Sequence, residues 1–163
     1  MKSAGLTSQK QQIDALFARA EDLYRLVQDG KFRYEFEIQA DLARYLCIRV
    51  CGLVDSAVNQ ILAEYIDVHA PPKLARFASL SFGRQQNLKA NRLLELVAQF
   101  NPDWEKALRQ FLTEERKDAL DSLVDNRNNI AHGRSTGITH VRVWQYYRPV
   151  LEIIDFLEAQ CLA

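Results

Sequence analysis

Arg127, Asn128 and His132 lie close together in the stretch RNNIAHG, residues 127–133. A histidine exchanges protons near neutral pH, and an arginine can hold two phosphate oxygens at once. These side chains suit the cleavage of RNA without a metal ion, in which the ribose 2′-hydroxyl attacks the neighbouring phosphorus. His132 would move protons, Arg127 would stabilise the charged phosphorane, and Asn128 would orient either group. The products would be a 2′,3′-cyclic phosphate and a 5′-hydroxyl.

The motif lies at the end of an amphipathic helix predicted over about residues 114–132. Thr113 is its expected N-cap, and Gly133 follows its last residue as a C′ glycine would. Arg127 falls on the apolar stripe of this helix, where a guanidinium needs a partner. One interpretation of Arg127 is therefore a structural arginine that snorkels or pairs with a core carboxylate, for which Asp55, beside the stripe of an earlier helix, is a candidate. The stripe consists of Leu120, Leu123, Val124, Arg127, Ile130 and Ala131.

The spacing within the motif divides its residues between two faces. Asn128 and His132 are four residues apart and share a face with Asp125. Arg127 and His132 are five apart, which separates them by about 140° around a helix. They would converge if the helix ended before His132, or if two copies of the motif met across a dimer. The alternative for His132 is a histidine at a helix C-terminus, where the helix dipole favours a cation.

A segment without acidic residues follows the motif, although Lys+Arg and Asp+Glu are both 21 and the net charge is zero. Between Asn126 and Leu151 there is no Asp or Glu, and aromatic residues are interleaved with arginines. Basic and aromatic side chains in one segment favour contacts with a phosphate backbone and bases. The expected RNA contacts are Arg134, Arg142, Trp144 and Arg148.

Other site chemistries lack their motifs. The sequence contains no GxxxxGK[ST], GxGxxG, HExxH or GxSxG pattern. His69 and His140 have no ligand spacing to His132 or to the cysteines, so neither a metal nor a cofactor is expected. Cys47 and Cys51 lie one helical turn apart; they are either a redox pair or half a metal site, or two small buried residues of a reduced protein.

The remaining elements are also helical. The 163 residues are 48% hydrophobic and 26% charged, which is typical of a globular domain. Stripes predict helices from about Ile13 to Val27, closed by Asp29-Gly30, from Phe32 to His69, and from Leu88 to Phe100, with a looser stretch between the last two. Asn101 should cap a further helix that begins at Pro102.

The last predicted helix covers about residues 139–162. Thr139 should cap it, Ile138 and Val143 fit a hydrophobic staple, and Pro149 should kink it. The prediction is one all-α domain over residues 1–163, an antiparallel bundle of about five or six helices. With no apolar leader and no apolar run of membrane length, the expected location is the cytoplasm, away from membranes.

The motif in this all-α setting resembles the HEPN superfamily. The stretch ERKDALDSLVDNRNNIAHGRSTGIT looks like the RiboL-PSP-HEPN group in particular. The stretch ARYLCIRVCGLVDSAVNQILAEYI is similar to that group's long second helix. The resemblance covers roughly residues 30–160.

This resemblance implies a function and a site. Many members of the superfamily are metal-independent endoribonucleases that act as homodimers with a composite cleft. Several are toxins or phage-defence effectors, and some pair with an antitoxin protein. By motif match, Arg127 and His132 would be catalytic with Asn128 as companion, and Asp55 and Asp125 would support them. Other members are inactive, so the alternative is a non-catalytic module that binds RNA, a nucleotide or a protein partner.

Overall fold

Seven helices and no strand are found in the computed structural model, which describes residues 4–28, 35–81 and 86–162. The all-α bundle is confirmed, with one helix more than the upper expectation. The turn Asp29-Gly30 and the expected start at Phe32 lie outside the described residues. The helices are α1 Ala4–Gln28, α2 Glu35–His69, α3 Pro72–Ser81, α4 Ala90–Ala98, α5 Pro102–Phe111, α6 Glu114–Ala131 and α7 His140–Cys161.

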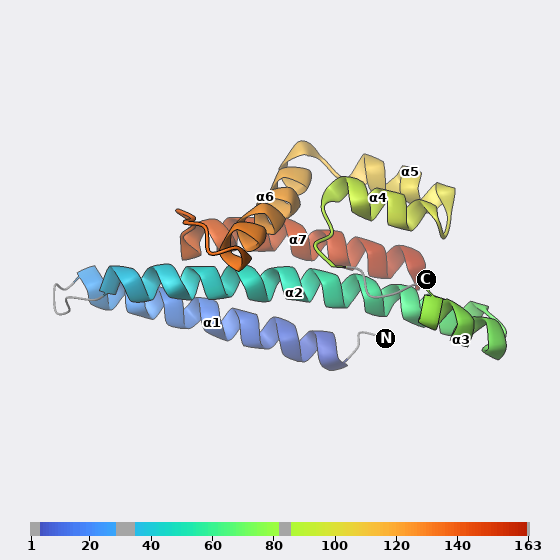
Figure 1. Ribbon diagram of the computed structural model, residues 1–163, viewed down its shortest axis with the longest axis horizontal. Coiled ribbons are helices and arrows are strands. Elements are labelled where there is room, and N and C mark those ends of the chain that lie inside the picture. Colours follow the sequence, from blue (N-terminus) through green and yellow to red (C-terminus); the bar gives the residue numbers. More distant parts are fainter. Residues whose placement is uncertain (1–3, 29–34, 82–85, 163) are drawn as a thin grey trace.

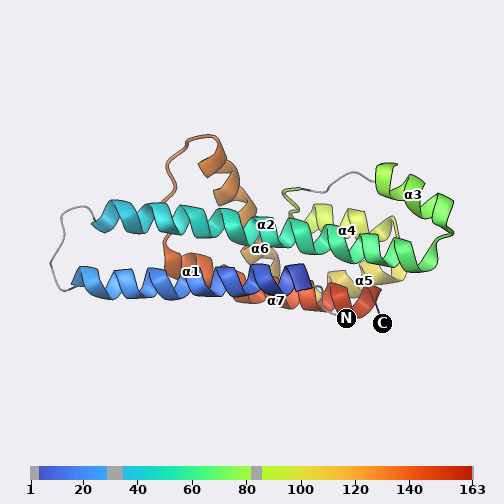
Figure 2. The same cartoon turned by 90° about the horizontal axis from the view of Figure 1, so that it is seen from below.

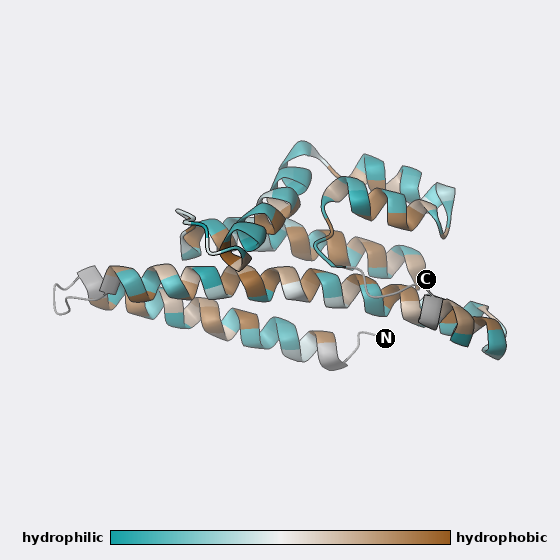
Figure 3. Cartoon of the chain, viewed as in Figure 1, coloured by the Kyte–Doolittle hydropathy of each residue, from teal (hydrophilic) through white to brown (hydrophobic). Residues whose placement is uncertain are grey.

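The long helix α2 is the centre of the bundle. It contacts α1, α3, α6 and α7, with α1 running antiparallel beside it and α6 crossing it (Figures 1 and 2). The helices α4 and α5 form a hairpin above the C-terminal part of α7. Figure 3 shows the hydrophobic residues gathered where these helices face one another. The residues of α2 that are almost fully buried include Leu46, Cys47, Val50, Leu53 and Ala57.

By length and composition, Phe36–His69 is apolar enough to cross a membrane, although no such segment was expected from the sequence. More than half of its most apolar window is buried inside the bundle. The burial of α2 against its neighbours accounts for this composition, because a helix surrounded by others must be apolar on most sides.

The helix α3 corrects one expectation, because its second half falls in the stretch predicted to be loose. Of the residues of this helix whose burial is described, 72–78, only Ala75 is buried, whereas Leu74 and Phe77 are largely exposed. Leu74 and Phe77 are at helical spacing, but a helix of ten residues that follows Pro71 has too few turns for periodicity to indicate it. The next helix is also shorter than the predicted Leu88–Phe100, since α4 covers Ala90–Ala98.

The start of two helices is capped as the local sequence predicts, and the start of two others is not. The side chains of Asn101 and Thr139 accept backbone N–H bonds from Asp103 and Arg142, as their cap positions predict. The Thr113 side chain makes no cap bond. At the start of α4, the Lys89 side chain has no acceptor atom, and the Asp121 carboxylate of α6 accepts the Ala90 N–H instead, at 2.7 Å.

Candidate active site

The second half of α6 lies across α2 and carries the motif. At the crossing, the Cys47 thiol donates to the Leu123 carbonyl oxygen at 3.6 Å. Arg127, one turn further along α6, is half-buried, and its charge acts on Cys51 and Asp55 of α2. The stripe therefore continues through Arg127 to the partly buried Ile130, although Ala131 at its end is exposed. Arg127 lies on the side of α6 that faces α2.

Asp55 is near Arg127 but bonds elsewhere. Among the described residues the two side chains form no ion pair, and Asp55 Oδ2 accepts the Asn87 N–H at 3.2 Å. Burial raises the pKa of Asp55, although backbone hydrogen bonds from Asn87 and Leu88 and the Arg127 charge oppose the shift. The Arg127 Nη1 donates instead to Asn128 Oδ1 at 3.3 Å. The Arg127 guanidinium is thus steered by Asn128 and attracted by a carboxylate that it does not touch.

His132 is held by the way in which α6 ends. It is the C-cap residue, and its N–H donates to the Asn128 carbonyl at 3.1 Å. The Gly133 N–H donates to Ile130 O at 3.0 Å and the Arg134 N–H to Asn129 O at 2.8 Å. This pair of bonds is a Schellman motif, which requires a left-handed residue at C′, and Gly133 has φ +67°. The His132 side chain is exposed, so a fixed backbone presents a free imidazole.

Arg127 and His132 do not meet within one chain. The helix continues to Ala131, and His132 keeps the hydrogen bond of a helical residue. No contact between the two side chains occurs in the described part of the chain. An early end to the helix therefore does not bring them together. The second route, convergence across a dimer, stays a prediction.

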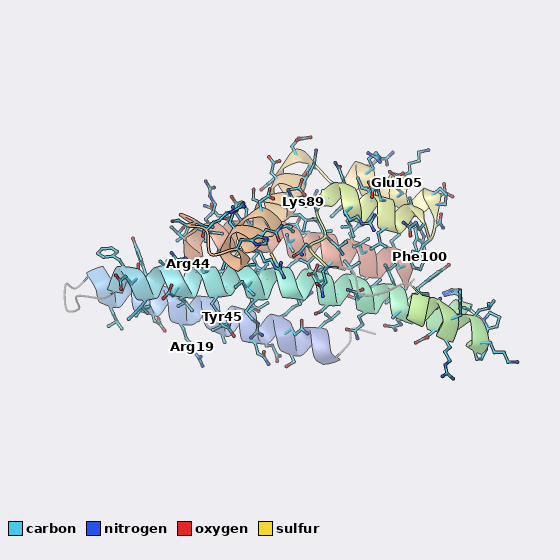
Figure 4. All side chains as sticks on the ribbon, in the orientation of Figure 1. Arg19, Arg44, Tyr45, Lys89, Phe100 and Glu105 are labelled. Atoms are coloured by element: carbon cyan, nitrogen blue, oxygen red, sulfur yellow. The ribbon has the colours of Figure 1, made fainter. Side chains whose placement is uncertain are left out.

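A loop before α4 adds two residues that the sequence analysis missed. Asp125, exposed on α6, forms an ion pair with Lys89 at 2.6 Å; Figure 4 labels Lys89 where this loop meets α6. Asn87, which donates to Asp55, has φ +56°, a conformation that asparagine tolerates better than most residues. Because both contacts join residues far apart in the sequence, no local pattern indicates them.

The residues expected to contact RNA are distributed over more than one face. Arg134 is exposed in the loop after α6. Arg142 and Arg148 line a cavity of about 630 Å³ between α6 and α7. Trp144 instead packs edge-to-face on Phe17 of α1, with ring centroids 4.8 Å apart. The cavity also contains the carboxylates of Glu115, Asp118 and Glu152, so its charge is mixed.

The three cysteines are free and buried. A hydrogen bond with Cys47, and burial, raise the pKa of the Cys51 thiol, and burial raises that of Cys161 to about 11. A buried thiol that stays protonated is a poor nucleophile and a poor metal ligand. Among the described residues, no group of three or more His, Cys, Asp or Glu side chains is placed to hold a metal ion. The hydrogen bond with Cys51 lowers the pKa of the Cys47 thiol, but Cys47 has no exposed surface in the core, so burial favours packing as the role of both Cys47 and Cys51.

Comparison with known proteins gives one match. The family model described as RiboL-PSP-HEPN matches residues 14–163, which is most of the chain. No curated protein matches the sequence. No solved structure matches it either.

Proposed function

Because the chain belongs to the RiboL-PSP-HEPN family, we propose that it is a metal-independent endoribonuclease whose site is completed in a homodimer. The observation that carries the proposal is the end of α6. There the exposed His132 is fixed by a Schellman motif, one turn beyond the bonded pair Arg127–Asn128. One rigid element thus presents His132, which can transfer protons, and Arg127, which can bind phosphate.

The reaction needs two proton transfers and one charge to be stabilised. One His132 takes the proton of the ribose 2′-hydroxyl while that oxygen attacks phosphorus. The His132 of a second copy gives a proton to the departing 5′-oxygen, so the two imidazoles exchange protonation states. Arg127 holds the non-bridging oxygens, and Asn128 orients its guanidinium through the 3.3 Å bond. Asp55 and Asp125 support the site from α2 and from the Lys89 ion pair.

The open face of α2, defined here by Ile38, Tyr45, Ile48 and Gly52, is where the second copy would pack. Its three large side chains are each more than two-fifths exposed, at helical spacing. Gly52 lies in the middle of a 35-residue helix, and an added Cβ would meet no atom within 4 Å. A glycine there costs about 0.5–1 kcal/mol against alanine. Close approach of another chain would account for a glycine at this position, and it would place the motifs of the two chains near each other.

The test is cleavage of labelled single-stranded and structured RNAs in EDTA. The wild-type protein should leave 2′,3′-cyclic phosphate ends, and His132→Ala should lose cleavage while its circular dichroism is unchanged. His69→Ala is the matched control, since His69 is an exposed histidine at the end of α2. Equal cleavage by wild type and His132→Ala would overturn the role of His132. Arg127→Ala should also be inactive, but its stability must be measured beside it, because Arg127 is half-buried.

A non-catalytic binding module is the second candidate. The observation that favours it is the separation of Arg127 from His132 within one chain. It predicts saturable, salt-dependent RNA binding without cleavage. Substituting Arg134, Arg142 or Arg148 would then weaken binding more than His132→Ala does.

The proposed cellular role is that of a cytoplasmic toxin or phage-defence effector restrained by an antitoxin protein. Expression of the wild-type chain should then arrest growth, whereas His132→Ala should not. Equal growth with both proteins would contradict this role.

A further inference from the structure

A cavity of about 240 Å³ lies between the start of α2 and the loop that follows the motif. Phe36 and Gln39 line it from α2, Thr136 and Gly137 line it from the loop, and His140 lines it from the start of α7. Thr136 is four residues after His132, so their Cα atoms are at most about 14 Å apart. The cavity is therefore a neighbour of the proposed active site.

Two side chains that line this cavity each carry a buried polar atom without a hydrogen bond. They are Gln39 and Thr136, whose Nε2 and Oγ1 atoms have no partner among the described residues. His140 also lines the cavity, but its Nε2 lies 3.5 Å from Glu21 Oε2 of α1. Buried polar groups in folded proteins are nearly always bonded, because an unbonded one destabilises the protein. Two of them at one cavity indicate a polar ligand that completes the bonds.

The chemistry of the lining matches a nucleobase. The Gln39 amide donates, and the Thr136 hydroxyl both donates and accepts, which are the two kinds of bond that a base edge makes. The Phe36 ring is 78% exposed and offers a stacking surface. Gly137 leaves room for close approach, since an added Cβ would meet no atom within 4 Å. We propose that this cavity binds one base of the RNA, close to the cleaved phosphate, and so sets the sequence preference of the enzyme. This inference rests on the proposed function.

The test separates binding from cleavage. Gln39→Leu and Thr136→Val remove the unbonded polar groups with little change in size. Gln110→Leu and Thr113→Val are the matched controls, on exposed residues outside the cavity. The probes are the four nucleoside 5′-monophosphates, which cannot be cleaved, titrated into each protein and followed by ligand-observed NMR. We expect one monophosphate to bind preferentially to the wild type, and both cavity variants to bind it about 3- to 10-fold more weakly. Their thermal stability should equal or exceed that of the wild type.

The outcomes distinguish this proposal from the nuclease assignment. If monophosphate binding is the same in wild type and cavity variants, or absent from all of them, the base site is wrong, even where His132-dependent cleavage is observed. If the cavity variants are destabilised and bind unchanged, ordered water fills the cavity and the base site is also wrong. If binding is lost in the cavity variants but no RNA is cleaved, the base site holds and the nuclease assignment fails. A shift of cleavage-site preference in Gln39→Leu would support both proposals.

Discussion

Replacing Gly52 with alanine should have opposite effects on the single chain and on its dimer. Within the chain, the new methyl group meets no atom within 4 Å, so only the helix propensity changes. That change stabilises the folded monomer by about 0.5–1 kcal/mol. For a domain of this size, the melting temperature should rise by about 1–4 °C. If a second copy packs closely on Gly52, the same methyl group overpacks the interface at a cost of about 1–3 kcal/mol. The dimer dissociation constant should then rise about 5- to 140-fold.

Both quantities can be measured on one preparation. Sedimentation velocity over a concentration series gives the dissociation constant, and thermal unfolding at the lowest concentration gives the stability of the monomer. Ala15→Gly, on the exposed side of α1, is the control: it should lower stability by a similar amount without changing association. A stabilised variant that dimerises as tightly as the wild type would refute the placement of the interface on the open face of α2. A destabilised monomer would refute the account of Gly52 itself.

Three further outcomes follow from side chains away from that face. Asp55→Asn should make the protein more stable than the wild type at neutral pH, because burial raises the pKa of Asp55 and its charged form is the costly one. As the pH rises above the ordinary carboxyl pKa of 3.8, the wild type loses the stability that the protonated form of Asp55 gives it. The difference in melting temperature between Asp55→Asn and the wild type should therefore disappear in acid, when melting is followed against pH. The buried thiols, Cys51 and Cys161 included, should not react with a thiol reagent at pH 8 until denaturant is added; reaction in the native state would contradict their burial. Arg116→Met should lower the free energy of unfolding in urea by about 1–2 kcal/mol, since Arg116 pairs with Glu152 at 2.7 Å and lies 4.1 Å from the centre of the Phe111 ring. An unchanged urea midpoint would show that neither contact contributes.

The sequence predicts those parts of the fold that depend on near neighbours. Asn101, Thr139 and Gly133 mark helix ends because each acts within a few residues of itself. The helix α3 was missed because its ten residues follow Pro71 and are too few for periodicity to be recognised. The cap of α4 by Asp121 joins two residues that are 31 apart in the sequence and lie on different helices, and no spacing rule within one helix describes it.

In the candidate site, too, the sequence predicts what depends on near neighbours and misses the contacts between distant residues. The position of Arg127 on the α2 side follows from helical periodicity, and so does its angular separation from His132. The partner of Asp55 could not be predicted, because the loop that brings the Asn87 N–H to it has no periodicity. The interleaved arginines and aromatic residues are neighbours in the sequence but do not all lie on one face of the folded chain. On a helix, Trp144 turns toward α1 while Arg142 turns toward α6.

The capping of α4 by a carboxylate of α6 sets an order of assembly. A helix of nine residues is too short to persist alone in water, and the residue before this one cannot cap it. Its first turn gains a hydrogen-bond acceptor only after Asp121 has been brought into place by the docking of α6. The segment from Lys89 onward should therefore become ordered only after α6 is in place. Any event that loosens α6 should also release the start of α4, because Asp121 then no longer holds the Ala90 N–H. In the native state the amide protons of α4 should therefore exchange with solvent no more slowly than those of α6.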